Sequence, residues 1–247
     1  MTRLSSKTAV VTGGGRGLGS AICSALAAEG AHVLVVDRNT EAADEMVAII
    51  EKAGGSASAE TLDISDREGV MAFGARVVEQ YGEIDVLVNN AGIAPRIRPN
   101  DPDQMQKWEQ VIDVNLTGQW DITIALLPAL EHKDASVIFV SSIAGFTAPR
   151  SSAAYGASKA AVRSLVQYFA RTLGPTGGRA NGLAPGRIKS DLMTVEGKAG
   201  EKFLERLPMG RVGETHEIAG PAIFLASDMS SYVTGVTIPV DGGYLAL

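Results

Sequence analysis

The chain has 247 residues, of which 45% are hydrophobic and 20% charged, and its formal net charge is −6. This length suits one α/β domain or two small ones, and the composition is typical of a globular protein. The acidic balance argues against binding to nucleic acid or to an anionic membrane, because both attract basic faces. The single cysteine, Cys23, excludes an internal disulfide and is predicted to be a buried structural thiol in a small, apolar helical stretch.

The sequence begins with MTRLSSKTAVV, which lacks the apolar core of a secretory signal. No stretch reaches the roughly 20 apolar residues that a membrane-spanning helix needs. We therefore expect a cytoplasmic chain without a membrane or nucleic-acid partner.

Apolar runs alternate with helical patterns along the whole chain. In chain order, strands are predicted over 7–12, 32–37, 58–63, 84–90, 135–142, 179–184 and 236–240. Helices are predicted over 16–30, 40–53, 66–82, 102–130, 152–173 and 214–227. Near-continuous apolar strands that alternate with helices indicate a parallel sheet covered on both faces. The prediction is a single domain over 1–247 with the doubly wound, Rossmann-type α/β architecture, and with a substrate lid over 187–212.

A glycine-rich turn, TGGGRGLG, lies between the first predicted strand and the first predicted helix. Glycines there let the backbone approach a pyrophosphate, whose negative charge the helix N-terminus favours. The strand–turn–helix context predicts a dinucleotide site rather than a merely flexible turn.

Asp37 ends the second predicted strand, where a carboxylate can accept hydrogen bonds from the adenosine ribose. The same carboxylate would repel a 2′-phosphate, so NAD is favoured over NADP. Arg16 and Arg38 keep NADP possible, because a guanidinium pairs with phosphate. The alternative for both arginines is solvent-facing charge.

Tyr155 and Lys159 stand four residues apart in YGASK, so on a helix they share one face. A lysine near a phenol favours the phenolate and can make tyrosine a base. Taken alone, the pair is more often a solvated surface pair, because such pairs are common on helices.

Eight motifs together make the chain resemble the short-chain dehydrogenase/reductase family over nearly its whole length. They are TGGGRGLG (12–19), LDIS (62–65), NNAG (89–92), VNLTG (114–118), SS (141–142), YGASK (155–159), APG (184–186) and VDGG (240–243). The resemblance implies an enzyme in which Tyr155 is the general acid/base and Lys159 lowers its pKa and binds the nicotinamide ribose. It further implies that Ser142 holds the substrate oxygen and that Asn115 fixes a water linking Lys159 to solvent.

The resemblance also implies a set of cofactor contacts along the sheet edge. These are Gly13, Arg16, Gly17, Leu18, Gly19, Asp37, Arg38, Asp63, Ile64, Asn89, Ala91, Gly92, Tyr155, Lys159, Pro185, Gly186, Ile188 and Ser190. Ser190 stands where the family often has threonine. The three histidines lack ligand spacing, so no metal site is expected.

The substrate pocket is less well defined by the sequence. Arg150 and Met193 are predicted to contact substrate together with Ser142 and Tyr155. A basic rim would favour an anionic or polyhydroxylated substrate, and it would include Arg96, Arg98, Arg187 and Lys189. The alternative is that these are ordinary charges at solvated loop ends. Equally, an apolar pocket could be lined by Phe146, Met193 and Phe203.

The favoured function is an NAD-dependent dehydrogenase of secondary alcohols such as polyols, sugars, hydroxy acids or cyclic alcohols. The alternatives are an NADPH-dependent carbonyl reductase of the 3-oxoacyl-carrier type and a non-catalytic NAD-binding regulator. The family resemblance implies a homotetramer, and the apolar end VTIPVDGGYLAL fits a buried tail.

Overall fold

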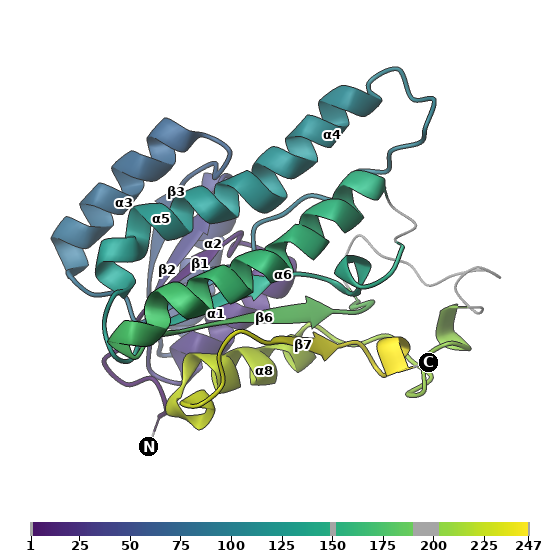
Figure 1. The fold of residues 1–247 in the computed structure, drawn as a ribbon. Coiled ribbons are helices and arrows are strands. Elements are labelled where there is room, and N and C mark those ends of the chain that lie inside the picture. Colours follow the sequence, from purple (N-terminus) through teal and green to yellow (C-terminus); the bar gives the residue numbers. More distant parts are fainter. Residues whose placement is uncertain (1, 149–151, 190–202, 247) are drawn as a thin grey trace.

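The chain forms a seven-stranded parallel sheet with helices on both faces, as a computed structural model of residues 2–148, 152–189 and 203–246 describes it (Figure 1). The strands are Thr8–Thr12 (β1), His32–Asp37 (β2), Ser56–Thr61 (β3), Val86–Asn89 (β4), Ser136–Val140 (β5), Arg179–Pro185 (β6) and Thr237–Val240 (β7). Their order across the sheet is β3-β2-β1-β4-β5-β6-β7. This arrangement confirms the predicted doubly wound α/β class.

Two layers of helices cover the sheet. The helices are Gly17–Ala28 (α1), Thr40–Lys52 (α2), Arg67–Tyr81 (α3), Gln104–Ile112 (α4), Gly118–Leu130 (α5), Ala153–Leu173 (α6) and His216–Ala226 (α8). Buried side chains of α1, α2 and α8 form one core with the sheet, and those of α3, α5 and α6 form a second core on its other face. Figure 1 shows α3, α5 and α6 together above the sheet.

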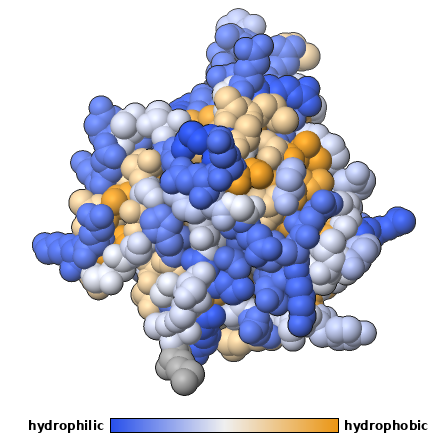
Figure 2. Space-filling model, turned by 90° about the vertical axis from the view of Figure 1, so that its left-hand side faces the viewer, coloured by the Kyte–Doolittle hydropathy of each residue, from blue (hydrophilic) through white to orange (hydrophobic). Residues whose placement is uncertain are grey.

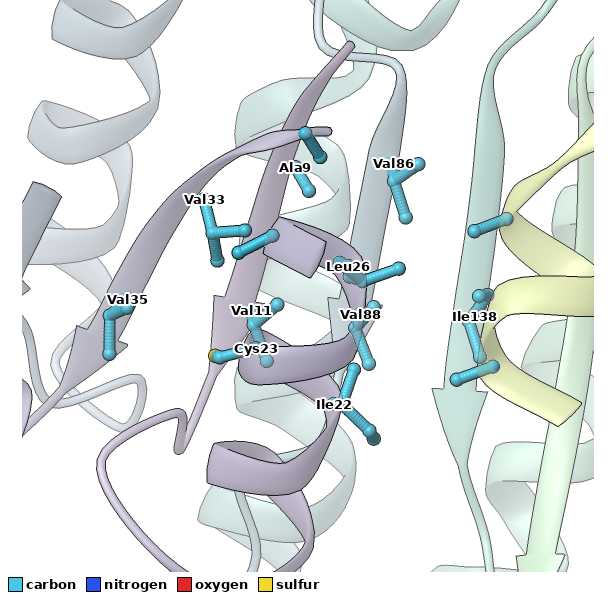
Figure 3. Close-up of a cluster of buried hydrophobic side chains, with 14 of the residues drawn as sticks. Ala9, Val11, Ile22, Cys23, Leu26, Val33, Val35, Val86, Val88 and Ile138 are labelled. Carbon is cyan, nitrogen blue, oxygen red and sulfur yellow. The ribbon is translucent and has the colours of Figure 1, made fainter. Parts of the chain in front are cut away.

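The apolar strands follow from this double coverage. In β1, Ala9 and Val11 belong to the core under α1, whereas Val10 belongs to the opposite core. A strand buried on both faces needs apolar residues at consecutive positions, which is the pattern that the sequence shows. Figure 3 shows Cys23 on α1 among buried valines, which confirms the buried thiol. Burial raises the pKa of that thiol above its ordinary value.

The predicted helix over 102–130 is helical without a break from α4 through α5, but it is not α-helical throughout. Between α4 and α5 the chain makes a π-helical turn over Asp113–Thr117. The side chain of Asn115 in this turn is fully buried and hydrogen-bonds the backbone of Ile93 on both its N–H and its carbonyl. A π turn inside a helix commonly marks a functional position, and this one is set by a tertiary contact that sequence periodicity does not contain.

The carboxyl ends of all seven strands meet at one edge of the sheet, and strand order reverses between β1 and β4 there. Ligands of doubly wound proteins bind at such a reversal. The predicted lid over 187–212 lies partly outside the described residues and stays a prediction. Within the described residues, no helix is both long and apolar enough to cross a membrane.

Candidate active site

A cavity of about 570 Å³ opens at the carboxyl ends of β1, β2, β4, β5 and β6. Its walls combine the glycine turn, the ends of these strands and the face of α6. The lining residues are Gly13, Arg16, Gly17, Leu18, Asp37, Arg38, Leu62, Asp63, Ile64, Asn90, Ala91, Gly92, Ile93, Ala94, Val114, Val140, Ser141, Ser142, Tyr155, Lys159, Pro185, Gly186, Ile188 and Lys189. Most of the predicted cofactor and catalytic residues are therefore brought together around one space.

The glycine turn is shaped by two left-handed residues, Gly13 with φ 62° and Gly17 with φ 60°. A Cβ on Gly13 would lie 2.9 Å from the Cα of Ala91, so only glycine fits there. Gly19 is not among the residues that line the cavity, and its predicted contact with the cofactor stays a prediction. A Cβ on Gly19 would overlap the Gly13 carbonyl oxygen, so its role is to let α1 approach the turn.

Asp37 is held rigidly at the end of β2. Its Oδ2 accepts a hydrogen bond from the Gly15 N–H at 3.1 Å, and its Oδ1 accepts one from the Asn39 N–H at 3.0 Å. Arg16 and Arg38 line the same part of the cavity. A left-handed glycine turn opening α1 beside a fixed carboxylate fits an adenine dinucleotide, because the turn can admit a pyrophosphate and the acid faces the ribose position.

Of the two asparagines at the end of β4, Asn90 lines the cavity, whereas the sequence analysis had named Asn89. Asn89 is fully buried and lies outside the cavity, and its Nδ2 donates to Thr123 Oγ1 at 2.9 Å. Asn90 lines the cavity instead, and its Nδ2 donates to the carbonyl oxygens of Thr12 and Gly13. The sequence reasoning missed Asn90. Alternation along the strand turns neighbouring side chains to opposite faces, so it could have separated the two.

Every second residue from the end of β4 onward is hydrogen-bonded to a side chain on one face of the following helix. Thr123 pairs with Asn89, Gln119 Nε2 donates to the Ala91 carbonyl oxygen at 3.2 Å, and Asn115 bonds Ile93. Four helical residues rise about 6 Å, and two extended residues span about 6.6 Å, so the two spacings match. This ladder fixes the cavity wall formed by Ala91, Gly92 and Ile93.

Tyr155 and Lys159 project from α6, whose first turn is capped by the Ser152 side chain. The Lys159 Nζ lies 5.9 Å from the centroid of the Tyr155 ring and donates to the Val140 carbonyl oxygen at 2.8 Å. Burial lowers the pKa of Lys159 to about 8. Tyr155, Lys159 and Ser142 all face the cavity, which places a phenol, an amine and a hydroxyl around one space.

The pKa of Tyr155 is raised, not lowered, in the chain on its own. Burial is the main cause, and a hydrogen bond with Ser142 acts in the opposite direction. The expected lowering by Lys159 is absent because the lysine ammonium is directed to Val140 and its own burial disfavours its charge.

Asn115 is held firmly beside Lys159, and its predicted role of fixing a water stays a prediction. Its side-chain amide is bonded directly to Ile93 and donates to Ser158 Oγ at 3.2 Å. A Cβ placed on Gly92 would lie 3.2 Å from Asn115 Oδ1 and 3.4 Å from Lys159 Nζ. The bare Gly92 backbone therefore keeps open the space between these two side chains.

The remaining predicted residues fall in three groups. Pro185, Gly186 and Ile188 line the cavity. Arg96 and Arg98 are exposed and lie outside its lining, as does Phe146. Ser190, Arg150 and Met193 lie outside the described residues. No group of three or more His, Cys, Asp or Glu side chains in the described ranges is placed to hold a metal ion.

Comparison with known proteins gives full-length similarities. A family model described as enoyl-(acyl carrier protein) reductase matches residues 13–245. A 3-oxoacyl-[acyl-carrier-protein] reductase of Thermotoga maritima is 38% identical over 246 residues, with 98% of each chain covered. A trans-4-hydroxycyclohexanecarboxylate dehydrogenase of Sinomonas cyclohexanicum is 37% identical, covering 99% of this chain and 95% of the relative.

Solved structures also resemble this chain over its full length. The crystal structure of a gluconate 5-dehydrogenase from Burkholderia cenocepacia, in complex with NADP and tartrate, superimposes with a TM-score of 0.91 at 34% identity. The similarity covers 100% of this chain and 98% of that chain. These similar proteins are named for different substrates.

Proposed function

The chain belongs to the short-chain dehydrogenase/reductase family and is an NAD(P)-dependent oxidoreductase; from this premise we propose that it transfers hydride between a secondary alcohol and NAD. Polyols, sugars, hydroxy acids and cyclic alcohols form the proposed substrate class. One observation carries the proposal: Ser142, Tyr155 and Lys159 face the same cavity as the glycine turn and Asp37. Relatives named for a hydroxycyclohexanecarboxylate and for gluconate support an alcohol substrate.

The cavity residues divide into those that would hold the dinucleotide and those that would handle the proton. Gly13, Gly17 and the first turn of α1 would receive the pyrophosphate, and Asp37 the adenosine ribose. At the other end, Pro185, Gly186 and Ile188 would flank the nicotinamide, which supplies the hydride acceptor or donor when bound. Lys159 would bond the adjacent ribose.

Tyr155 would exchange the proton of the substrate hydroxyl at its phenol oxygen. Its raised pKa keeps the phenol protonated at neutral pH, which suits proton donation to a carbonyl. Oxidation of an alcohol needs the phenolate, so positive charge must come close to the ring. Protonated Lys159, with its Nζ 5.9 Å from the centre of the Tyr155 ring, would supply part of this charge, and the positive nicotinamide ring of bound NAD⁺ would supply the rest. Ser142 would hold the substrate oxygen beside the phenol.

A second function is favoured by specific observations. Several relatives are 3-oxoacyl-[acyl-carrier-protein] reductases, and solved neighbours contain NADP. Arg16 and Arg38 line the cavity beside Asp37, where they could pair with a 2′-phosphate. An NADPH-dependent carbonyl reductase is therefore the alternative, and the fixed carboxylate of Asp37 counts against it.

The test begins with a titration of the protein with NADH and with NADPH, in which nicotinamide fluorescence reports binding. Alcohols and ketones are then screened as substrates with the cofactor that binds. Tyr155→Phe removes the acid/base while leaving the ring, so it should bind cofactor within about twofold and lose roughly a hundredfold or more of turnover. Full turnover in Tyr155→Phe would reject the proton role. Cofactor binding without turnover on either screen would instead favour a non-catalytic regulator.

We also propose that the enzyme is a homotetramer. Large apolar side chains are exposed on α4 and α6, such as Trp108 (38%) and Tyr168 (53%), and beside β7, where Tyr232 is fully exposed. Figure 2 shows that the face on the side of α3 is mostly hydrophilic, with small separate apolar patches. Sedimentation equilibrium at micromolar concentration should give four times the mass of 25.7 kDa, and a stable monomer would refute the proposal.

A further inference from the structure

The loop that carries Ser142 is docked along one face of α6. Tyr155, Lys159 and Arg163 are spaced four residues apart on that helix, so they follow one another along the same side. The loop runs from Ser141 through a short 3-10 turn, Ile143–Gly145, to Phe146. Each of the three helix positions contacts a part of this loop.

The first two positions bring the loop beside the reacting groups. Ser142 and Tyr155 line the same cavity, and the Ser142 hydroxyl acts to lower the pKa of the Tyr155 phenol. One turn along, Ser141 Oγ donates to the Lys159 carbonyl oxygen at 2.7 Å. Gly145 packs so closely on the same carbonyl that a Cβ would lie 2.6 Å from the oxygen. The loop and the helix backbone are therefore in direct contact at this point.

The third contact belongs to Arg163. Its Nη1 donates to the Gly145 carbonyl oxygen at 3.1 Å, and its guanidinium carbon lies 3.7 Å from the centroid of the Phe146 ring. Phe146 is 37% exposed and belongs to neither buried core. The far end of the loop is thus held by the planar guanidinium, which bonds the carbonyl and stacks on the ring together.

We propose that Arg163 is a positioning residue, which clamps the loop over 141–146 to α6 so that the Ser142 hydroxyl stays against the Tyr155 phenol. This inference rests on the proposed function of Tyr155 as acid/base. Arg163 does not line the cavity, so it acts through the loop and not on the substrate.

The clamp has a consequence that a merely structural arginine would not have. The bond from Ser142 opposes the burial that raises the pKa of Tyr155. Loosening the loop weakens that bond, so the phenol should ionise at a higher pH. Alcohol oxidation, which needs the phenolate, should then begin at a higher pH as well.

The test compares Arg163→Met with the wild type. Methionine keeps apolar packing but cannot bond the Gly145 carbonyl or stack a guanidinium on Phe146. Ring-labelled tyrosine NMR reports the phenol directly, and loss of one signal in Tyr155→Phe identifies Tyr155 among the five tyrosines. The Tyr155 signal should move at neutral pH in Arg163→Met, and the onset of its titration should rise. NADH or NADPH affinity should stay within about twofold of the wild type.

Arg171→Met is the matched control, because Arg171 is exposed in the last turn of the same helix. It should leave the Tyr155 signal unchanged. If Arg163→Met does not fold, Phe146→Leu removes the stacking partner and should shift the signal in the same direction. An unchanged Tyr155 signal and titration in a folded variant would overturn the clamp.

An activity measurement separates this inference from the proposed function. On any alcohol that the wild type oxidises, Arg163→Met should lose roughly tenfold in kcat, and its pH profile should move up. If Arg163 acts through Tyr155, adding Arg163→Met to Tyr155→Phe should cost little more. A shifted NMR signal in an enzyme whose Tyr155→Phe variant keeps full turnover would leave the clamp standing and reject the catalytic role of Tyr155.

Discussion

The Lys159 Nζ donates a hydrogen bond to the Val140 carbonyl oxygen at 2.8 Å, which ties α6 to the carboxyl end of β5. Lys159 is only 3% exposed, so this bond is made away from water. Burial of the ammonium lowers its pKa from 10.5 to about 8. The group that supports Tyr155 is therefore kept partly neutral at a cost in stability.

That cost predicts the effect of Lys159→Met on unfolding. Below pH 8 Lys159 is charged in both the folded and the unfolded chain, so burying the charge lowers the free energy of unfolding by its full amount. Between pH 8 and 10.5 the folded chain has lost this proton while the unfolded chain still binds it, so the loss of stability disappears as pH rises. Lys159→Met should be more stable than the wild type at pH 7, by at most about 3 kcal/mol. Urea unfolding should show this advantage shrinking toward pH 10.

The exposed Lys52 supplies the control for this measurement, since Lys52→Met should show no such change with pH. An advantage of Lys159→Met that grows with pH would contradict the argument.

The sequence identified the architecture and most of the cavity because both depend on local patterns. Asp37 was predicted from its place at the end of an apolar strand, and β2 has the predicted bounds. Tyr155 and Lys159 were predicted to share a helix face from their spacing of four, and both face the cavity.

What the sequence could not supply depends on contacts between distant segments. The π turn at Asn115 is set by bonds to Ile93, and helical periodicity contains no sign of them. Asn89 and Asn90 are the same residue type, and although alternation turns them to opposite faces, their contacts show which one is buried. From the sequence alone, Arg163 is an ordinary charge on a helix surface. Only the structure shows that it bonds the Gly145 carbonyl in the loop after β5.

Gly92→Ala tests the space between Asn115 and Lys159. The added methyl would lie 3.2 Å from Asn115 Oδ1 and 3.4 Å from Lys159 Nζ, inside the cavity. The variant should fold, and its affinity for NADH or NADPH should fall by roughly tenfold, the equivalent of about 1.4 kcal/mol. Fluorescence titration measures this directly.

Gly220→Ala is the matched control for Gly92→Ala. Gly220 is exposed in α8, with open space around the added methyl, so this change should stabilise the chain by up to about 1 kcal/mol and leave cofactor affinity alone. Equal cofactor affinity in the two alanine variants would reject the importance of the space at Gly92.

Asp37→Asn tests the choice between NAD and NADP. The amide oxygen can still accept a backbone hydrogen bond, but the negative charge that repels a 2′-phosphate is removed. The ratio of NADPH to NADH affinity should rise by roughly tenfold or more. Arg38→Met should move the ratio in the opposite direction if Arg38 can reach the phosphate. An unchanged ratio in Asp37→Asn would mean that the carboxylate does not select the cofactor.

Gln119 and Thr123 test the ladder that fixes the wall of the cavity. Thr123→Val keeps the shape of the side chain but leaves Asn89 Nδ2 without its acceptor in a fully buried site. It should cost about 1–3 kcal/mol of stability. Gln119→Leu removes the bond to the Ala91 carbonyl, so it should also displace the wall and raise the Kd of NADH or NADPH several-fold.

Thr123→Ser separates the hydrogen bond from packing, because serine keeps the hydroxyl and loses only the methyl. Its cofactor affinity should match the wild type even if its Tm falls. The ladder of hydrogen bonds supports cofactor binding only if Thr123→Val and Gln119→Leu, which each remove one bond, weaken that binding and Thr123→Ser does not. Wild-type Kd values in both Thr123→Val and Gln119→Leu, with Tm lowered, would show that the rungs support the fold alone.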